Sequence, residues 1–173
     1  MLVHEAIKTN RSIRQFTDQP VSRENITTIV NAGRLAGSAK NKQPWHFVVV
    51  TRRETLAALS TCGPWCEHLA GAAFAVVLVA EDLHMPRTLT TPFDLGRASQ
   101  NMILAAWELG IASCMATIYE PDTARQACNI PDEMDVPWAI SFGYPHPEVD
   151  PRNRPPRAGG RRPLDEVVHW ETW

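Results

Sequence analysis

Apolar side chains recur with the spacing of helices in several segments of the chain. Residues 23–35 carry Ile26 and Ile29 on one helical face, and Ser22 directly before them is a favoured N-cap. The same pattern predicts helices over residues 1–9, 52–60, about 92–109 and 121–129. Each helix is expected to pack its apolar face against a shared core. Phe93 is expected on the apolar face of the helix over about residues 92–109.

Other apolar segments have the length and composition of strands. Phe74–Ala80 is an uninterrupted apolar run, which is typical of a strand covered on both faces. Shorter extended segments are predicted at 46–51, 111–118 and 136–144. Gly110 suits the left-handed position that follows a helix. Interleaved helices and strands predict one α+β or α/β domain over residues 1–173, without fixing the order of its strands.

The last part of the chain has a different composition. Six prolines fall between residues 145 and 163, so this part cannot form a core of its own. It nevertheless ends in LDEVVHWETW, which is apolar enough to dock on a surface. Both features predict an arm, about residues 145–173, that crosses to another subunit.

The overall charge argues against nucleic acid and anionic lipid as partners. The chain of 173 residues has a formal net charge of −2 and a pI near 6.3. Basic residues nonetheless crowd one segment near the C-terminus, at Arg152, Arg154, Arg157, Arg161 and Arg162. A protein that binds nucleic acid or an acidic partner is therefore an alternative, although no aromatic residues are interleaved with these arginines.

The sequence also bears on compartment and metals. No stretch approaches the ~18 apolar residues of a membrane span, and the N-terminus lacks the apolar region of a signal peptide. The four cysteines, Cys62, Cys66, Cys114 and Cys128, have no CxxC spacing, and no histidines recur at the intervals of metal ligands. We therefore expect a cytoplasmic protein with free thiols, without a metal site and without a membrane partner.

Two basic clusters are candidates for binding an anion. Arg11, Ser12 and Arg14 lie in a segment expected to be extended, where alternation places Ser12 and Arg14 on one side. Guanidinium groups match phosphate oxygens in a bidentate manner, and a hydroxyl can complete the set of donors. Arg161 and Arg162 could close on the same anion from the other end of the chain. The alternative is a solvated basic face.

The stretch SAKNKQPWHFVVV, residues 38–50, has the composition of a loop that holds a flat ring. Asn41 and Gln43 offer donors and acceptors to the edge of a heterocycle. Ser38 and Ala39 are small enough for the backbone to approach such a ring. Trp45 is alternatively a core anchor and no part of the site.

The segment GIASCMATI, residues 110–118, is a third candidate because its small residues permit close approach of a ligand to the backbone. A buried strand is the alternative for most of its positions.

Five motifs in order resemble the flavin-dependent nitroreductase family in its short bacterial form. They are RSIRQF, SAKNKQPWHFVVV, DLGRASQNMILAAWELGIASCM, ISFGYP and GRRPLDEVVHWETW. The likeness runs from about residue 5 to the end. It implies an α+β sandwich, a central and mostly antiparallel sheet flanked by helices, in an intertwined homodimer with exchanged C-terminal arms. Two FMN molecules would lie at the subunit interface.

The resemblance also implies a role for each candidate group. One subunit would bind the FMN phosphate and ribityl chain through Arg11, Ser12 and Arg14, joined by Arg161 and Arg162 from the tail. The other subunit would contact the ring system through Ser38, Ala39, Asn41 and Gln43. The backbone of Ala116, Thr117 and Ile118 would face the reactive edge of the flavin near N5.

The reaction implied by the resemblance has two steps. NAD(P)H delivers a hydride to flavin N5 and leaves, and a nitroaromatic, quinone or similar acceptor is then reduced in the same place. No side chain is needed as a nucleophile or general acid, so no catalytic residue is named; Trp65 and His68 are interface residues or neighbours of the pocket. A dehydrogenase or oxidase of a biosynthetic pathway is an alternative, because fold and flavin do not fix the substrate.

One position departs from the family's pattern. The family usually has an arginine directly before the Arg-Ser pair, and this chain has Asn10 there. A cation near the pyrimidine edge stabilises an anionic reduced flavin, and an amide can only donate hydrogen bonds. We therefore predict a lower flavin reduction potential, or looser binding, than in relatives with arginine.

Overall fold

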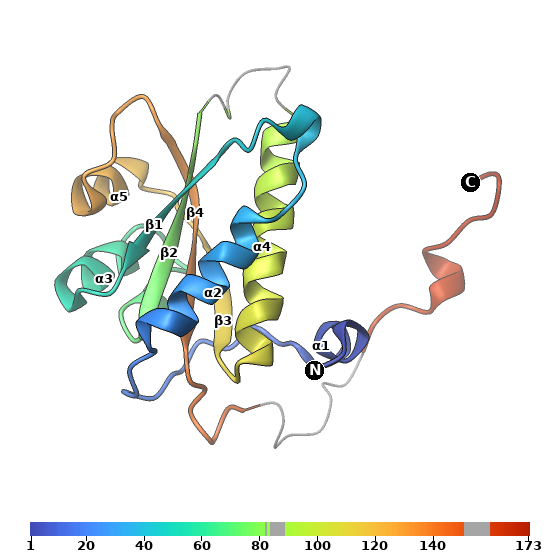
Figure 1. Cartoon of the computed structure of the whole chain (residues 1–173), viewed down its shortest axis with the longest axis horizontal. Coiled ribbons are helices and arrows are strands. Elements are labelled where there is room, and N and C mark those ends of the chain that lie inside the picture. Colours follow the sequence, from blue (N-terminus) through green and yellow to red (C-terminus); the bar gives the residue numbers. More distant parts are fainter. Residues whose placement is uncertain (82, 84–88, 151–159) are drawn as a thin grey trace.

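The computed structural model describes residues 1–81, 83, 89–150 and 160–173, and its centre is a four-stranded sheet (Figure 1). The strands are β1 (Trp45–Val50), β2 (Phe74–Ala80), β3 (Ala112–Thr117) and β4 (Asp135–Gly143), in the order β1-β2-β4-β3. All three pairings are antiparallel. The described part of the chain is therefore of the α+β class, and the α/β alternative is wrong.

The pairing register shows which ends of the four strands lie together at each end of the sheet. Trp45 pairs with Ala80, so β1 begins where β2 finishes. At the opposite end Phe74 pairs with Phe142, and Ala112 pairs with Gly143, so β3 begins where β4 finishes. Because β1 and β3 are the edge strands, their outer backbone groups can form contacts outside the sheet, and Ser113 of β3 already pairs there with Ser12.

Two pairs of helices cover the two faces of the sheet (Figure 1). One face packs against α2 (Arg23–Arg34) and α4 (Thr90–Glu108), and the other against α3 (Arg53–Ser60) and α5 (Pro121–Cys128). The short helix α1 (Val3–Thr9) lies against the last turns of α4, where the Trp107 indole donates to the Thr9 hydroxyl at 2.9 Å. Three short 3-10 helices, η1 (Ala39–Asn41), η2 (Glu67–Leu69) and η4 (Leu164–Glu166), complete the described elements.

Strand alternation explains why β2 is apolar throughout. Phe74, Val76 and Leu78 belong to the core beneath α2 and α4, and Val77 and Val79 belong to the core beneath α3 and α5. All seven residues of β2 are buried. The predicted strand over Phe74–Ala80 is thus confirmed, and so is its expected coverage on both faces.

Most predicted helices begin and end close to their expected positions. The Ser22 hydroxyl accepts a hydrogen bond from the Asn25 amide at 3.2 Å, so the predicted N-cap of α2 is confirmed. Gly110 follows α4 with φ of 75°, as expected. The prediction for Phe93 is wrong: this side chain is largely exposed and lies under the guanidinium of Arg97, 5.8 Å from its ring centroid.

The C-terminal segment divides into two described parts. Residues 145–150 stay with the body of their own chain, since Pro145 forms a bridge with Phe16 and the His146 amide donates to the Gln15 carbonyl at 3.0 Å. Residues 160–173 extend away from the body (Figure 1). Arg152, Arg154 and Arg157 lie outside the described residues. Within the described residues, no helix combines the length and hydropathy that a membrane crossing requires.

Candidate functional site

The N-terminal segment after α1 runs along the edge of β3. Ser12 forms a parallel bridge with Ser113, and the Ile13 amide donates to the Ser113 carbonyl at 3.0 Å. Ile13 is buried, whereas Ser12 and Arg14 are exposed. The predicted alternation is confirmed: Ser12 and Arg14 share one side of an extended backbone and present a hydroxyl and a guanidinium to the surface.

Arg11 and Asn10 are engaged with the end of α1. The Arg11 Nη1 donates to the carbonyls of Lys8 and Asn10, at 2.9 and 2.7 Å. Asn10 is the C-cap of α1, and its Nδ2 is buried without a hydrogen-bond partner among the described residues. Arg11 therefore contributes its charge next to Ser12 and Arg14, while part of its hydrogen-bonding capacity is used within its own chain.

A buried polar group lies behind Ser12 and Arg14. The Ser141 hydroxyl lies 2.8 Å from Nδ1 of His68, with which it shares a hydrogen bond, and 3.3 Å from the Cys114 carbonyl oxygen. The other ring nitrogen of His68, Nε2, is buried without a partner that meets hydrogen-bond geometry among the described residues. Burial lowers the pKa of His68 to about 4, and the nearby charge of Arg14 acts in the same direction.

Cys114 faces the same region from β3. Burial raises the pKa of its thiol, and this effect is opposed by the charge of Arg14 and by a hydrogen bond from Ser12. The expectation that His68 lies near the candidate site is consistent with these interactions. Sequence reasoning did not find its link to Ser141, because the two residues are 73 positions apart and neither belongs to a spaced motif.

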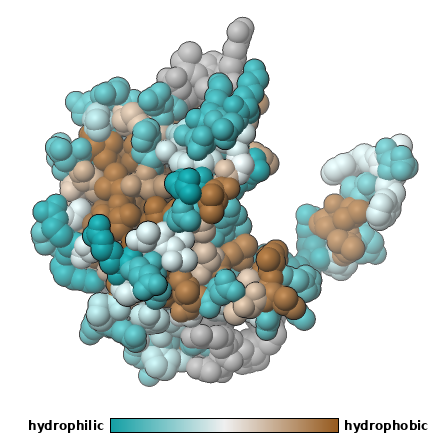
Figure 2. Space-filling view, in the orientation of Figure 1, coloured by the Kyte–Doolittle hydropathy of each residue, from teal (hydrophilic) through white to brown (hydrophobic). Residues whose placement is uncertain are grey.

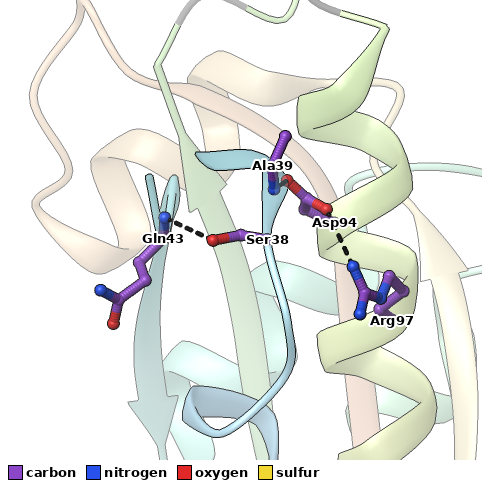
Figure 3. Close-up of polar contacts among 5 residues, drawn as sticks. All are labelled: Ser38, Ala39, Gln43, Asp94 and Arg97. Carbon is purple, nitrogen blue, oxygen red and sulfur yellow. Dashed lines mark hydrogen bonds and ion pairs between the residues drawn. The ribbon is translucent and has the colours of Figure 1, made fainter. Parts of the chain in front are cut away.

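The second candidate group is the loop that leads from α2 into β1 (Figure 3). The Ser38 hydroxyl accepts from the Gln43 amide at 2.9 Å, which closes the loop on itself. The Ala39 amide donates to Oδ2 of Asp94 in α4 at 2.9 Å. A second oxygen of Asp94 lies 3.6 Å from Nη1 of Arg97. Figure 3 shows Asp94 between the loop and Arg97.

This loop has an unusual backbone. Lys40, Asn41 and Gln43 have φ angles of 53°, 54° and 50°, in the left-handed region that favours glycine. A non-glycine residue in this region costs on the order of 1–3 kcal/mol and persists only where surrounding contacts hold it. Trp45 is buried at the base of the loop, stacked with Phe47, so the interpretation of Trp45 as a core anchor is confirmed. Asn41 and Gln43 are left exposed.

The third candidate group lies at the end of β3. Ala116 and Ile118 are buried and Thr117 is exposed. The Thr117 carbonyl accepts from the Cys66 thiol at 3.3 Å, and the Ile118 amide donates to the Pro137 carbonyl at 3.0 Å. The alternative of a buried strand therefore holds for two of the three positions. This group shares the β3 edge with the bridge at Ser12.

One chain does not bring all the candidate residues together. Ser12 and Arg14 lie along the β3 edge, at the end of the sheet where β4 finishes. The loop of Ser38 leads into β1 at the other edge and the other end. Arg161 and Arg162 are exposed on the extended segment away from both (Figure 1). Within one chain these are three separate surfaces.

An apolar groove lies between α2 and β1, with a volume of about 690 Å³. Its apolar lining includes Ile26, Val30, Phe47 and Val49, and Figure 2 shows apolar side chains gathered over this side of the molecule.

Among the described residues no three His, Cys, Asp or Glu side chains are grouped so as to hold a metal ion, and the four cysteines are free.

Comparisons with known proteins find similar sequences and folds. The profile of the Nitroreductase family matches residues 7–81 and 62–144. A relative from Archaeoglobus fulgidus, provisionally named NADH dehydrogenase/NAD(P)H nitroreductase, is 37% identical over 153 residues, which cover 83% of this chain and 86% of the relative. These matches confirm the resemblance inferred from the five motifs.

Two solved structures have the same fold. A provisionally named nitroreductase from Desulfovibrio desulfuricans, solved in complex with FMN, is 28% identical with a TM-score of 0.83, and the match covers 100% of this chain and 98% of that one. The NADPH:FMN oxidoreductase from Vibrio harveyi, solved with NAD+, is 25% identical with a TM-score of 0.82, covering 99% of this chain and 77% of that one. The predicted nitroreductase-like fold is confirmed.

Proposed function

Because the chain belongs to the nitroreductase family, we propose that it is an FMN-dependent oxidoreductase that transfers hydride from NAD(P)H to an electron-poor acceptor. A nitroaromatic or a quinone is the proposed class of acceptor. The observation that carries the proposal is the exposed pair Ser12 and Arg14 on the same strand edge as Ala116–118, in a chain whose fold matches an FMN complex. NAD(P)H as the reductant also favours a cytoplasmic location.

The described residues fit FMN in charge and in shape. The guanidiniums of Arg11 and Arg14 and the Ser12 hydroxyl supply cationic and neutral donors to a phosphate or a sugar hydroxyl. The buried Nε2 of His68 adds a hydrogen-bonding nitrogen behind them that has no partner among the described residues. Thr117 is the exposed residue at the end of β3, so a flat ring can approach the backbone of the strand there.

We propose that the site forms between two copies of the chain. The phosphate-binding residues and the loop of Ser38 lie at opposite edges and opposite ends of one sheet. A single FMN that contacts both groups therefore needs one group from each copy. Arg161 and Arg162 would join Ser12 and Arg14 once the extended segment is held by the partner.

The groove between α2 and β1 is the proposed binding site for the arm of the second copy, residues 160–173. The arm exposes Trp170 and Trp173, and burying one indole removes roughly 150–250 Å² from water. Arg23 and Arg34 line the groove. The arm carries the acidic residues Asp165, Glu166 and Glu171, so its charge is complementary to that of the groove. The position of β1 at the sheet edge leaves backbone groups that an arm can pair with.

In this arrangement each group of residues has its own task. FMN, when bound, supplies the acceptance and donation of hydride. Arg14 and Ser12 anchor the phosphate end, and Asn41 and Gln43 orient the ring through its polar edge. The backbone at Thr117 and Ile118 limits how deep the ring can lie. No described side chain is required to act as a general acid or a nucleophile.

The first experiment measures flavin binding. We expect the purified protein to show flavin absorption bands with about one FMN per chain, and Arg14→Gln to weaken FMN binding about 10- to 100-fold, the range for a hydrogen bond between charged groups. Arg52→Gln is the matched control, because Arg52 is an exposed arginine at the start of α3. Absence of flavin binding by the wild-type chain would refute the proposal.

The second experiment tests the dimer. Val49→Lys places a charge in the groove and is expected to give monomers by light scattering, together with weaker FMN binding. His46→Lys is the control, since His46 is an exposed neighbour on the same strand and does not line the groove. A monomeric wild-type protein that binds FMN would contradict the two-copy site but not the activity.

Two further experiments separate the alternatives. A biosynthetic dehydrogenase or oxidase would have its flavin reduced by an organic substrate faster than by NADH or NADPH, which anaerobic stopped-flow absorbance distinguishes. A binder of nucleic acid would show an affinity for oligonucleotides that falls steeply with salt.

A further inference from the structure

We propose that Asp94 and Arg97 of α4 are positioning residues, which hold the loop from Ser38 to Gln43 in the shape that receives the flavin ring. This inference rests on the proposed FMN-dependent function. It adds two residues that the sequence motifs did not assign to the site and that touch neither a reacting atom nor the phosphate end.

The contact between α4 and the loop is short and buried. Oδ2 of Asp94 accepts the Ala39 amide at 2.9 Å, across 55 positions of sequence. The Asp94 side chain is only 3% exposed. A buried carboxylate requires hydrogen bonds and a counter-charge, and Asp94 has both, in the Ala39 amide and in Arg97 at 3.6 Å. The carboxylate therefore holds the beginning of the loop in place through the Ala39 amide.

Arg97 contacts the loop from a second direction. A side-chain Cβ at Gly37 would lie 2.3 Å from Nη2 of Arg97, so the guanidinium fills the space that any larger residue would need. Gly37 does not have the left-handed φ that would otherwise explain a glycine. The guanidinium therefore lies close against Gly37, and a methyl group at this position would have to displace it; the guanidinium also lies over the Phe93 ring, 5.8 Å from its centroid.

The loop needs such external contacts because its backbone is strained. Lys40, Asn41 and Gln43 all have positive φ, and the hydrogen bonds within the loop, from the Asn41 and Lys42 amides to the carbonyls of Ser38 and Ala39, close only short turns. When the Asp94 contact is weakened, the loop can relax toward ordinary φ angles. Asn41 and Gln43 would then rotate away from the edge of the ring that they are proposed to contact.

The test compares Asp94→Asn with Asp122→Asn. Asn keeps the size of Asp94 and one oxygen for the Ala39 amide, but its NH₂ group faces the cation of Arg97. Asp122 forms an i, i+3 pair with Arg125 on α5 and is exposed, so Asp122→Asn is the control for losing a paired carboxylate charge outside the loop. Gly37→Ala is a second variant, because it displaces Arg97 and leaves Asp94 in place.

Three quantities are measured: the dissociation constant for FMN, the visible circular dichroism of bound FMN, and the melting temperature of the flavin-free chain. For Asp94→Asn and Gly37→Ala we expect an altered dichroism band and FMN binding about tenfold weaker, the loss expected for one hydrogen bond to a charged group. For Asp122→Asn we expect binding and dichroism to be unchanged.

The outcomes separate this inference from the proposed function. If the wild-type chain binds no FMN, the proposed function fails and this inference fails with it. If the wild type binds FMN and the variants match it in affinity and dichroism, only this inference is overturned. A lower melting temperature with unchanged dichroism would make the pair merely structural and would also overturn it. If Asp94→Asn does not fold, Gly37→Ala decides by the same criteria.

Discussion

Acidification is expected to destabilise the protein through His68. The histidine is 7% exposed, shares a hydrogen bond with Ser141 through Nδ1 and has a pKa of about 4 in the folded chain, against 6.5 for an unperturbed histidine. The folded state therefore binds fewer protons than the unfolded state between these two values. Stability contributed by neutral His68 is fully present above pH 6.5 and is lost as the pH falls toward 4.

The magnitude follows from the two pKa values. At pH 5 an unfolded histidine is protonated by a ratio of about 30 to 1, whereas folded His68, with a pKa of about 4, stays mostly neutral. The difference corresponds to about 2 kcal/mol of unfolding free energy lost relative to pH 7.5. With a urea dependence of about 2 kcal/mol per M, the midpoint of unfolding should fall by about 1 M through this residue alone.

The assay is urea unfolding at pH 7.5 and pH 5, followed by tryptophan fluorescence at a fixed protein concentration. His68→Gln removes the titrating group, so its midpoint should depend less on pH than that of the wild type, by about 1 M. His4→Gln replaces an exposed histidine and should leave the pH dependence unchanged. Equal pH dependence in the wild type and His68→Gln would refute the assignment of a buried, neutral His68.

Three other substitutions test local features. Ser22→Ala removes the cap that accepts from Asn25 and should cost about 1 kcal/mol in urea unfolding. Gly143→Ala would place a Cβ 2.9 Å from the Phe16 ring and should cost about 1–3 kcal/mol in the same assay. Asn10→Arg should raise the flavin midpoint potential in spectroelectrochemical titration; no rise would remove the proposed effect of Asn10.

The sequence predicts local structure where one physical signal dominates. Phe74–Ala80 is apolar at every position and forms β2 with the bounds expected. Ser22 and Gly110 mark helix ends through capping chemistry that acts within a few residues. Phe93 is placed wrongly because helical periodicity does not register a neighbouring cation: Arg97, one turn further along α4, lies over this exposed ring.

Strand order and the supporting residues of the site depend on contacts between distant segments. Asp94 meets Ala39 across 55 positions, and His68 meets Ser141 across 73. Neither contact leaves a spacing pattern, because the residues belong to different elements that only the packing of the whole fold brings together. The donors Ser12 and Arg14 could be predicted, since alternation in an extended segment is a local rule.

The separation of the candidate residues has a thermodynamic consequence for the proposed function. A site that takes Arg14 from one copy and Asn41 from another exists only in the dimer, so FMN binding and dimerisation must stabilise one another. The apparent affinity for FMN should then depend on protein concentration. A substitution at Val49 in the groove, which is not among the proposed flavin contacts, should weaken FMN binding by shifting the chain toward monomers. A change at Asp94 acts otherwise: it alters the loop within an intact dimer, and its effect on FMN binding persists at saturating protein concentration.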